Sequence, residues 1–568
     1  MRRKIFSFAF LAQKIRGNEA KFLFGLALIT RLIALPFSQA MESDATSRLF
    51  LADHALHQGG ELASLQWPSL HIYFLSLAQF ISRDILWGPV ILSLLMGAFA
   101  VVPFYLFTKN IYSQKGAFYT ALIFTFSPLI FRLSFVPLSE IYHVCFCITA
   151  LWCLSEGLIR KDKKWKWGML AGLAATIAAG GRFEAWVLIG LLGIILIVLK
   201  EWKMMFAFGL TAAIFPVWWL IYCYRMTGHP LISLEMVEWQ NFVVGKVNEN
   251  MTEIERFRRV IYFPFEWLIS VTPIVAIMSV WFFVRAIVKR KITRLQFTFG
   301  CLFYFFLPFF VYESITGSLA DQARYTVTLI MLSLPSFALW FENSGKEKFK
   351  NSFAVIIAVL LIPWSYAWQR LPWHKVFFAS EIKQEVVAEI VATNFWQSEA
   401  IPSFHRPGIT TIVNAANKHT IAGDGYFIDF SGWCESYYFA QQSDLHNSHI
   451  NILSPVAPHN GDEGRMKIFF EQHPRGTILL SDFSDLSREQ TLHGPLLEFK
   501  GVEGALLLSP IMTDKHIRLF RYFYLPENET AVQRIKYKDT PPLFSAEKDL
   551  DYYITANYSD AGWIAETW

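Results

Sequence analysis

Long apolar stretches alternate with short polar connections over the first two thirds of the chain. A helix that crosses a bilayer needs about 20 mostly apolar residues, and fewer where neighbouring helices help. By that measure the sequence predicts eleven transmembrane helices. They are expected at residues 21–39, 86–108, 115–132, 138–158, 166–181, 183–199, 202–224, 265–288, 295–312, 322–341 and 351–369.

Two shorter apolar segments lie between the first two predicted spans. The first begins at Ser43, a typical N-cap residue, and its pattern ends before Gly59. The second runs from Trp67 to about Ile81. The apolar residues of the first recur at helical spacing, and both segments are too short to cross. We expect two helices that lie in the plane of the membrane interface.

Beyond about residue 375 the long apolar stretches end. Residues 383–395 have the spacing of an amphipathic helix. Short apolar runs of the kind that form buried strands follow at residues 410–413, 450–453, 477–480 and 505–508. The pattern therefore predicts a polytopic α-helical membrane domain at residues 1–370 and a small soluble α/β domain at residues 371–568.

Lysine and arginine gather in alternate connections, which sets the predicted orientation. The basic set comprises the N-terminus and residues 160–164, 200–203, 289–291 and 346–350. Basic loops stay in the cytoplasm, so the N-terminus is expected there. The odd number of spans then puts the C-terminal domain on the outer side.

The composition agrees with an integral membrane protein. The 568 residues are 54% hydrophobic and 17% charged, against about 25% charged in ordinary soluble domains. The net charge of +5 conceals an acidic C-terminal part, which argues against a nucleic-acid partner. Of the six cysteines only Cys434 lies in the predicted soluble domain, so that domain has no internal disulfide.

Charged residues interrupt the apolar segments, and all do so on the predicted outer side. They are Glu42 and Asp44 after the first span, Glu140 opening the fourth, Arg182 and Glu184 between the fifth and sixth, and Arg324 opening the tenth. A charge at the edge of a bilayer costs free energy unless it is solvated, paired with an opposite charge or engaged with a ligand. These residues are therefore functional-site candidates. Their shared sidedness predicts an outward polar cavity suited to a charged ligand.

Each candidate has a functional and a structural interpretation. Asp44, at the start of an interfacial helix, can act as a general base toward a hydroxyl or amine, but an acid in a first helical turn is also stabilising by itself. Arg182 and Arg324 suit a phosphate at headgroup depth, because arginine binds phosphate bidentately. The alternatives are pairs of Arg182 with Glu184 and of Arg324 with Asp321.

The order of these motifs resembles the GT-C superfamily of membrane glycosyltransferases. The likeness is greatest to the protein O-mannosyltransferase, aminoarabinose transferase and RgtA/B/C/D-like branch, and covers about residues 20–340. It rests on Asp44, on Trp67–Tyr73 with His71, on Ser139-Glu140, on Arg182-Phe183-Glu184, on Thr227–Pro230 with His229, and on Arg324-Tyr325. Relatives often have a second acid directly after the Asp44 position, where this chain has Ala45.

The resemblance implies an inverting transfer of a sugar from a polyprenyl-phosphate donor to a glycan, lipid or protein acceptor. Asp44 would be the base and Glu140 would orient a substrate. The donor phosphate would be held by Arg182, Arg324, Tyr325 and His229, with Glu42, Glu184 and His71 in support. No cofactor is assigned, and a divalent metal requirement is left open because the second acid is replaced.

The expected location is a bacterial inner membrane, surrounded by membrane lipids, with the C-terminal domain in the periplasm. Two other functions remain open. One is a transporter or flippase of a lipid-linked or anionic substrate, although the sequence lacks the internal repeats common in transporters. The other is a non-catalytic member of the superfamily.

Overall fold

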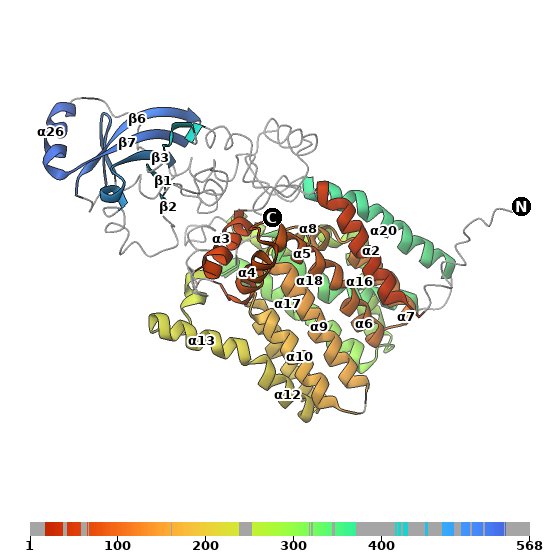
Figure 1. The fold of residues 1–568 in the computed structure, drawn as a ribbon. Coiled ribbons are helices and arrows are strands. Elements are labelled where there is room, and N and C mark those ends of the chain that lie inside the picture. Colours follow the sequence, from red (N-terminus) through yellow and green to blue (C-terminus); the bar gives the residue numbers. More distant parts are fainter. Residues whose placement is uncertain are drawn as a thin grey trace, which may run out of the picture. The chain divides into compact units, whose positions relative to one another are not determined.

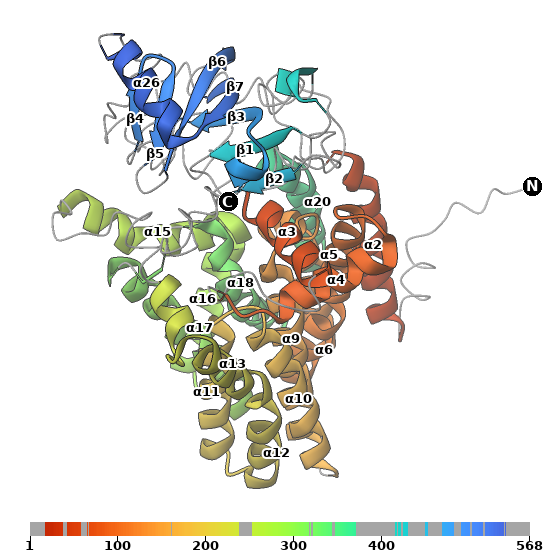
Figure 2. The ribbon, with the colours of Figure 1, turned by 60° about the vertical axis from the view of Figure 1, so that its left-hand side comes forward.

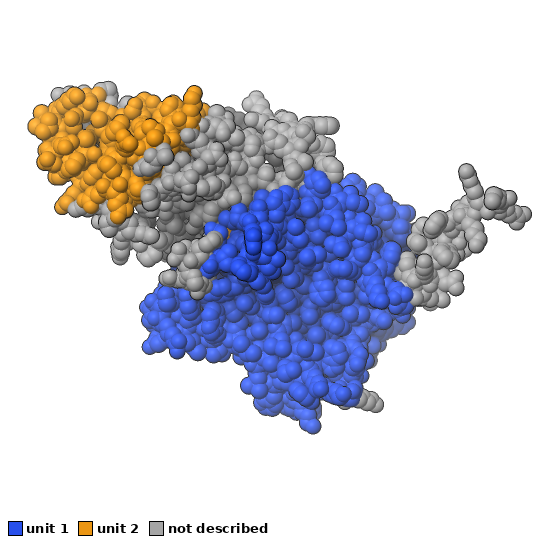
Figure 3. Space-filling model, viewed as in Figure 1, with its two compact units in different colours: residues 1–39, 51–402, 568 blue, residues 40–50, 403–567 orange. Residues whose placement is uncertain are grey.

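A computed structural model of the chain describes residues 17–37, 43–57, 65, 67–160, 162–237, 253–316, 318–319, 322–342, 347–370, 415–416, 418–421, 424–429, 449–452, 469–481, 490–499, 503–514, 517–538 and 540. The chain divides into two compact units, which Figure 3 colours separately. One contains residues 1–39, 51–402 and 568, and the other contains residues 40–50 and 403–567. The predicted boundary at residue 370 adjoins residues outside the described ranges and stays a prediction.

The first unit is built of helices (Figure 1). They are α2 (Glu19–Ala34), η1 (Leu35–Phe37), α3 (Ser43–His57, whose first residues belong to the second unit), α4 (Leu70–Ser82), α5 (Trp87–Phe99), α6 (Val101–Ile111), α7 (Gln114–Thr125), α8 (Pro128–Leu133), α9 (Ser139–Ile159), α10 (Lys164–Ala179), α11 (Glu184–Val198), α12 (Trp202–Ala212), α13 (Ile214–Thr227), α15 (Glu253–Val271), α16 (Pro273–Val288), α17 (Arg294–Thr316), η2 (Ala323–Thr326), α18 (Val327–Ser333), η3 (Leu334–Ala338), α19 (Leu339–Glu342) and α20 (Glu347–Arg370). The η elements are 3-10 helices.

Helices cover each of the eleven predicted spans, and the tenth, at residues 322–341, consists of four short helical elements, η2, α18, η3 and α19. Among the described residues, five helices are long and apolar enough to cross a membrane, or six if one bent pair counts as a span. The count of eleven therefore stays a prediction, while a membrane protein with several apolar helices is confirmed. The two segments predicted after the first span are also helical, as α3 and α4.

The eighth predicted span, residues 265–288, is not one straight helix. It is broken at Thr272, and the two halves are bent by 105°. Thr272 has φ of 80° and precedes Pro273, the first residue of α16. The residue before a proline is disfavoured in the helical region, so the backbone leaves the helix at this point. Consequently α15 runs crosswise to α16 (Figure 2).

Helix α9 forms the centre of the first unit. Its apolar window is 72% buried, and it packs against α10, α6, α5 and α18. Helix α10 lies between α9 and α12 in both ribbon views (Figures 1 and 2). Burying its apolar residues on several sides fixes the position of α9, which carries Glu140 in its first turn.

A seven-stranded mixed sheet forms the described part of the second unit, with strand order β2-β1-β3-β7-β6-β5-β4. The strands are β1 (Gly425–Asp429), β2 (His449–Ile452), β3 (Arg475–Ser481), β4 (Gln490–His493), β5 (Leu496–Phe499), β6 (Ala505–Asp514) and β7 (Ile517–Leu525), followed by helix α26 (Glu527–Tyr537). Strands β1, β2 and β3 are parallel and the others pair antiparallel.

The sheet has its own apolar core, which includes Phe427, Phe470 and Ile478. Tyr522 belongs to the same core, where its hydroxyl donates to the carbonyl of His473 at 3.0 Å. Burial raises the pKa of this phenol, so it stays a hydrogen-bond donor. Strands predicted at residues 450–453, 477–480 and 505–508 correspond to β2, β3 and β6. The helix at 383–395 and the strand at 410–413 lie outside the described residues.

Candidate functional site

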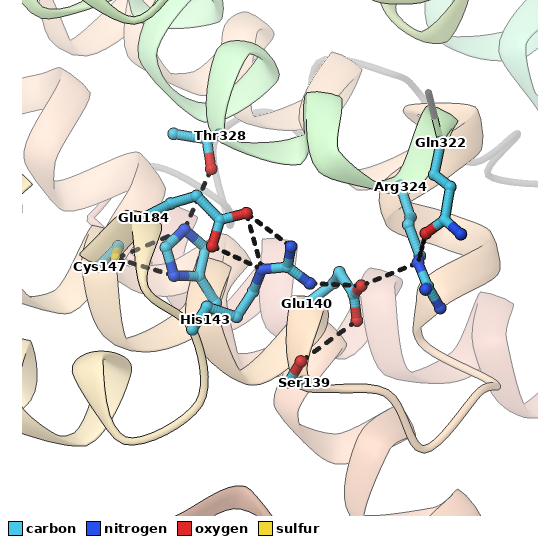
Figure 4. Close-up of polar contacts among 9 residues, drawn as sticks. Ser139, Glu140, His143, Cys147, Glu184, Gln322, Arg324 and Thr328 are labelled. Carbon is cyan, nitrogen blue, oxygen red and sulfur yellow. Dashed lines mark hydrogen bonds and ion pairs between the residues drawn. The ribbon is translucent and has the colours of Figure 1, made fainter. Parts of the chain in front are cut away.

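Four of the predicted charged residues meet inside the first unit (Figure 4). We call Glu140, Arg182, Glu184 and Arg324 the charge cluster. Arg182 Nη1 lies 2.5 Å from Glu140 Oε1, and Arg182 Nη2 lies 2.5 Å from Glu184 Oε1. Arg324 Nε lies 3.3 Å from the same Glu140 oxygen. The cluster joins three separate segments, α9, the α10–α11 turn and η2.

Close packing against α4 shapes the turn that presents Arg182. A Cβ at Gly180 would lie 2.4 Å from Leu70 Cβ, which is nearer than real contacts allow. The Gly180 carbonyl also accepts a hydrogen bond from the His71 backbone N–H at 3.3 Å. The lack of a side chain at Gly180 therefore lets the turn approach the start of α4.

Arg182 is held on all three of its side-chain nitrogens. Besides the two contacts above, Nε donates to both carboxylate oxygens of Glu184 at 3.1 Å. Glu140 is fully buried, and the Arg182 side chain is only 9% exposed. Buried charges need this kind of pairing, since either one alone would be expensive to remove from water. The predicted structural pairing of Arg182 with Glu184 is thus present, and Glu140 extends it.

Arg324 adds the second guanidinium, and an aromatic ring lies near both. Arg324 Nε donates to Gln322 Oε1 at 2.7 Å, and its terminal nitrogens point away from Gln322 (Figure 4). The Tyr325 ring centroid is 4.6 Å from Arg182 Cζ and 5.6 Å from Arg324 Cζ. These separations allow cation–π attraction, which helps to hold both guanidinium groups in place.

Two residues that the sequence analysis passed over form a second contact between the same elements. His143 Nε2 lies 3.1 Å from Thr328 Oγ1. His143 is three residues after Glu140 on α9, and Thr328 is four residues after Arg324. Residues at these spacings share a helix face. That spacing was the available signal, and the contact ties α9 to α18 beside the charge cluster.

The other predicted site residues have separate surroundings. His71 is buried on α4, with its ring edge-on to Tyr142 at 4.7 Å. His229 Nε2 lies 3.6 Å from Glu235 and has no described contact with the charge cluster. Asp44 lies in the first turn of α3, but its side chain, and the whole of Glu42, are outside the described residues.

The described residues contain no group of three or more His, Cys, Asp and Glu side chains arranged to hold a metal ion. What the charge cluster offers chemically is a set of fixed N–H donors. These donors are charged, buried and oriented by carboxylates. Such groups recognise anionic oxygen atoms, and phosphate in particular.

A family profile described as dolichyl-phosphate-mannose-protein mannosyltransferase matches residues 66–222 of the chain. The matched region contains Glu140, Arg182 and Glu184. No curated protein sequence gives a significant match to the chain.

Solved structures of proteins from two organisms are similar to this chain. ArnT from Cupriavidus metallidurans bound to undecaprenyl phosphate gives a TM-score of 0.57 at 11% identity, covering 88% of this chain and 97% of that one. Its apo structure gives 0.53 at 11% identity, with the same coverage of both chains. The oligosaccharyltransferase of Archaeoglobus fulgidus gives 0.49 at 10% identity, covering 81% of this chain and 68% of that one. The partial family match and the ArnT-like fold both agree with the resemblance to the GT-C superfamily of membrane glycosyltransferases that the motifs indicated.

Proposed function

We propose that the protein transfers a sugar from a polyprenyl-phosphate donor to an acceptor at the outer face of the membrane. The observation that carries the proposal is the buried charge cluster, in which two guanidinium groups flank Tyr325. Support comes from the ArnT structure of the same fold, which is bound to undecaprenyl phosphate. The proposed location is a bacterial inner membrane, with the C-terminal domain in the periplasm.

The residues predicted to bind the donor phosphate have different roles in this proposal. Arg182 already contacts two carboxylates. In our proposal it mainly positions Glu140 and adds positive charge near the phosphate. Arg324 and Tyr325 would make the main contacts with the donor phosphate. Negative charge grows on that phosphate as the sugar leaves, and fixed donors stabilise such charge without reorganising. His229, which is half-exposed beside Glu235, would join only through a movement of its loop.

Asp44 is the proposed general base. It would take the proton of an acceptor hydroxyl or amine, whose oxygen or nitrogen then attacks the anomeric carbon from the face opposite the phosphate. The bond from that carbon to the phosphate oxygen breaks, the configuration inverts, and polyprenyl phosphate leaves with the bonding electrons. Glu140 would orient the substrate through its second oxygen, with Glu42, Glu184 and His71 as supporting groups.

The test uses purified protein in liposomes and undecaprenyl phosphate carrying mannose, glucose, galactose or a pentose. Wild type should release sugar from one of these donors when a cell-envelope extract supplies the acceptor. Asp44→Asn should bind the donor normally yet lose transfer, because the isosteric amide accepts no proton. Full activity of a well-folded Asp44→Asn would remove Asp44 from the base role. Movement of the intact donor across the bilayer without sugar release would instead support the transporter interpretation.

A further inference from the structure

Helix α15 exposes Glu253 and Arg256 in its first turn. Beyond that turn, the charged residues Arg259 and Glu266 face the interior of the first unit. Its outer side exposes Ile254 and Phe257, which are 72% and 63% accessible. The opposite side carries Arg259 and Glu266, both buried. This is the reverse of a helix on a water-soluble protein, where the charged side faces out. It fits a helix with lipid on one side and a polar protein interior on the other.

Two hydrogen bonds fix the inward face of α15. Arg259 Nη1 donates to the Ser314 carbonyl on α17 at 3.1 Å. Trp267 Nε1 donates to Ser333 Oγ at the end of α18, at 2.8 Å. Glu266 lies on the same face between these two anchor points. Helix α15 also packs against η2, the segment that carries Arg324 of the charge cluster.

Glu266 differs from the two acids of the charge cluster in having no hydrogen-bond partner among the described residues. Its side chain has no exposed surface, and neither carboxylate oxygen has a hydrogen bond from any described residue. The hydroxyls of Ser270, one turn further on, and of Thr272 at the helix break are also buried without a partner among those residues. Glu140 and Glu184, by contrast, each have a guanidinium nitrogen at 2.5 Å.

Folding alone gives no reason to keep a carboxyl in this position. A buried polar group without a partner destabilises a protein, so native structures contain few of them. An acid within a membrane domain is accordingly a sign of ligand or ion recognition. The three groups without a partner among the described residues lie at positions 266, 270 and 272, at the C-terminal end of α15 and the break that follows it.

We propose that Glu266, with Ser270 and Thr272, binds hydroxyl groups of the sugar that the donor carries. This inference rests on the proposed function. A carboxylate has two acceptor oxygens side by side, which suit two neighbouring sugar hydroxyls, while serine and threonine both donate and accept. A phosphate would be repelled by this acid and matches Arg324 instead. A divalent cation would need several oxygen ligands, and this set contains a single acid.

The experiment compares the binding of bare undecaprenyl phosphate with that of the same lipid carrying mannose, glucose, galactose or a pentose. Purified full-length protein should bind at least one sugar-bearing lipid about tenfold or more tightly than the bare lipid, the gain expected from charge-assisted hydrogen bonds. Glu266→Gln should lose that gain and still bind the bare lipid as wild type does. Ser270→Ala should lose a smaller part.

Glu253→Gln is the matched control, since Glu253 lies on the same helix and its side chain is 91% exposed. It should behave as wild type. Glu266→Gln should melt at or above the wild-type temperature, because the substitution removes a buried acid that has no partner. The proposal is overturned if Glu266→Gln keeps the preference for sugar-bearing lipid, or if wild type prefers none of the four sugars. Failure of wild type to bind even the bare lipid would count against the proposed function itself.

Discussion

Replacement of Arg182 by glutamine tests whether the charge cluster holds the first unit together. The variant leaves two buried carboxylates facing one guanidinium, with Arg324 3.3 Å from Glu140. Removing one partner of a buried ion pair costs about 3–5 kcal/mol. Because Arg182 serves two carboxylates and is almost fully buried, we expect a loss near the upper end of that range. The free energy of unfolding can be followed in detergent through the helical circular-dichroism signal, which reports mainly on this unit.

A compensating variant makes the test specific to charge. Combining Arg182→Gln with Glu184→Gln leaves Glu140 and Arg324 as one balanced pair. The double variant should therefore be more stable than Arg182→Gln alone, with a coupling of about 1–3 kcal/mol between the two sites. Arg160→Gln is the control, since Arg160 pairs with Glu156 at a position that is 54% exposed and should cost under about 1 kcal/mol. Equal losses for Arg182→Gln and Arg160→Gln, or strictly additive effects, would refute the reasoning.

Three further substitutions test neighbouring parts of the site. Arg324→Lys keeps the positive charge but loses the planar guanidinium with its paired N–H donors. Under the proposed function, the Kd for bare undecaprenyl phosphate should therefore rise about tenfold. An unchanged Kd would exclude Arg324 from the phosphate site. Thr328→Val removes the hydroxyl that contacts His143 at nearly constant volume and should lower the free energy of unfolding by about 1 kcal/mol. Thr328→Ser keeps the hydroxyl, so its free energy of unfolding should stay close to that of wild type. Equal losses in the two variants would show that the hydrogen bond contributes nothing. Gly180→Ala should cost about 1–3 kcal/mol through overpacking against Leu70, and Leu70→Ala should restore part of that loss if the clash is its cause.

The sequence was sufficient to predict that Glu140, Arg182 and Arg324 lie close to one another. Glu140, Arg182 and Arg324 stand at the ends of apolar segments, and the segment count together with the basic loops gives each of them the same side. Helices that cross the same bilayer must then bring such ends to a common level. The meeting of these residues in the charge cluster follows from that constraint, without any knowledge of how the helices pack.

The choice of partners could not be predicted in this way. Arg182 and Glu140 are 42 residues apart, and no local spacing relates them. For Arg324 the structural partner expected from the sequence, Asp321, lies outside the described residues and stays a prediction, while the described contacts with Gln322 and Glu140 include a second acid that is distant in the sequence. Pairing depends on the rotation of α9 about its axis, and that rotation is set by packing against four other helices.

Glu266 is an acid at the start of a predicted span. It was not chosen as a candidate because the average hydropathy of residues 265–288 is high in spite of this single charge. The break at Thr272 was likewise signalled by the following proline. In the second unit, β7 was missed even though its residues 517–525 are rich in aromatic residues, which strands favour. Its place between β3 and β6 depends on antiparallel pairing with strands distant in the sequence, and such pairing is not encoded in a local pattern.

The balance of positive and negative charges in the charge cluster affects how easily the product of the proposed reaction would be released. The donor phosphate is a diester with one negative charge, whereas the polyprenyl phosphate product is a monoester with about 1.5 to 2. Two unpaired guanidinium groups would attract the product more strongly than the donor, because attraction grows with charge, and slow product release limits many enzymes. Glu140 and Glu184 cancel that net charge and hold the two guanidinium groups in fixed orientations. In the proposed function the site would therefore recognise the phosphate through the orientation of its guanidinium N–H groups. Its low net charge would let the polyprenyl phosphate product leave easily.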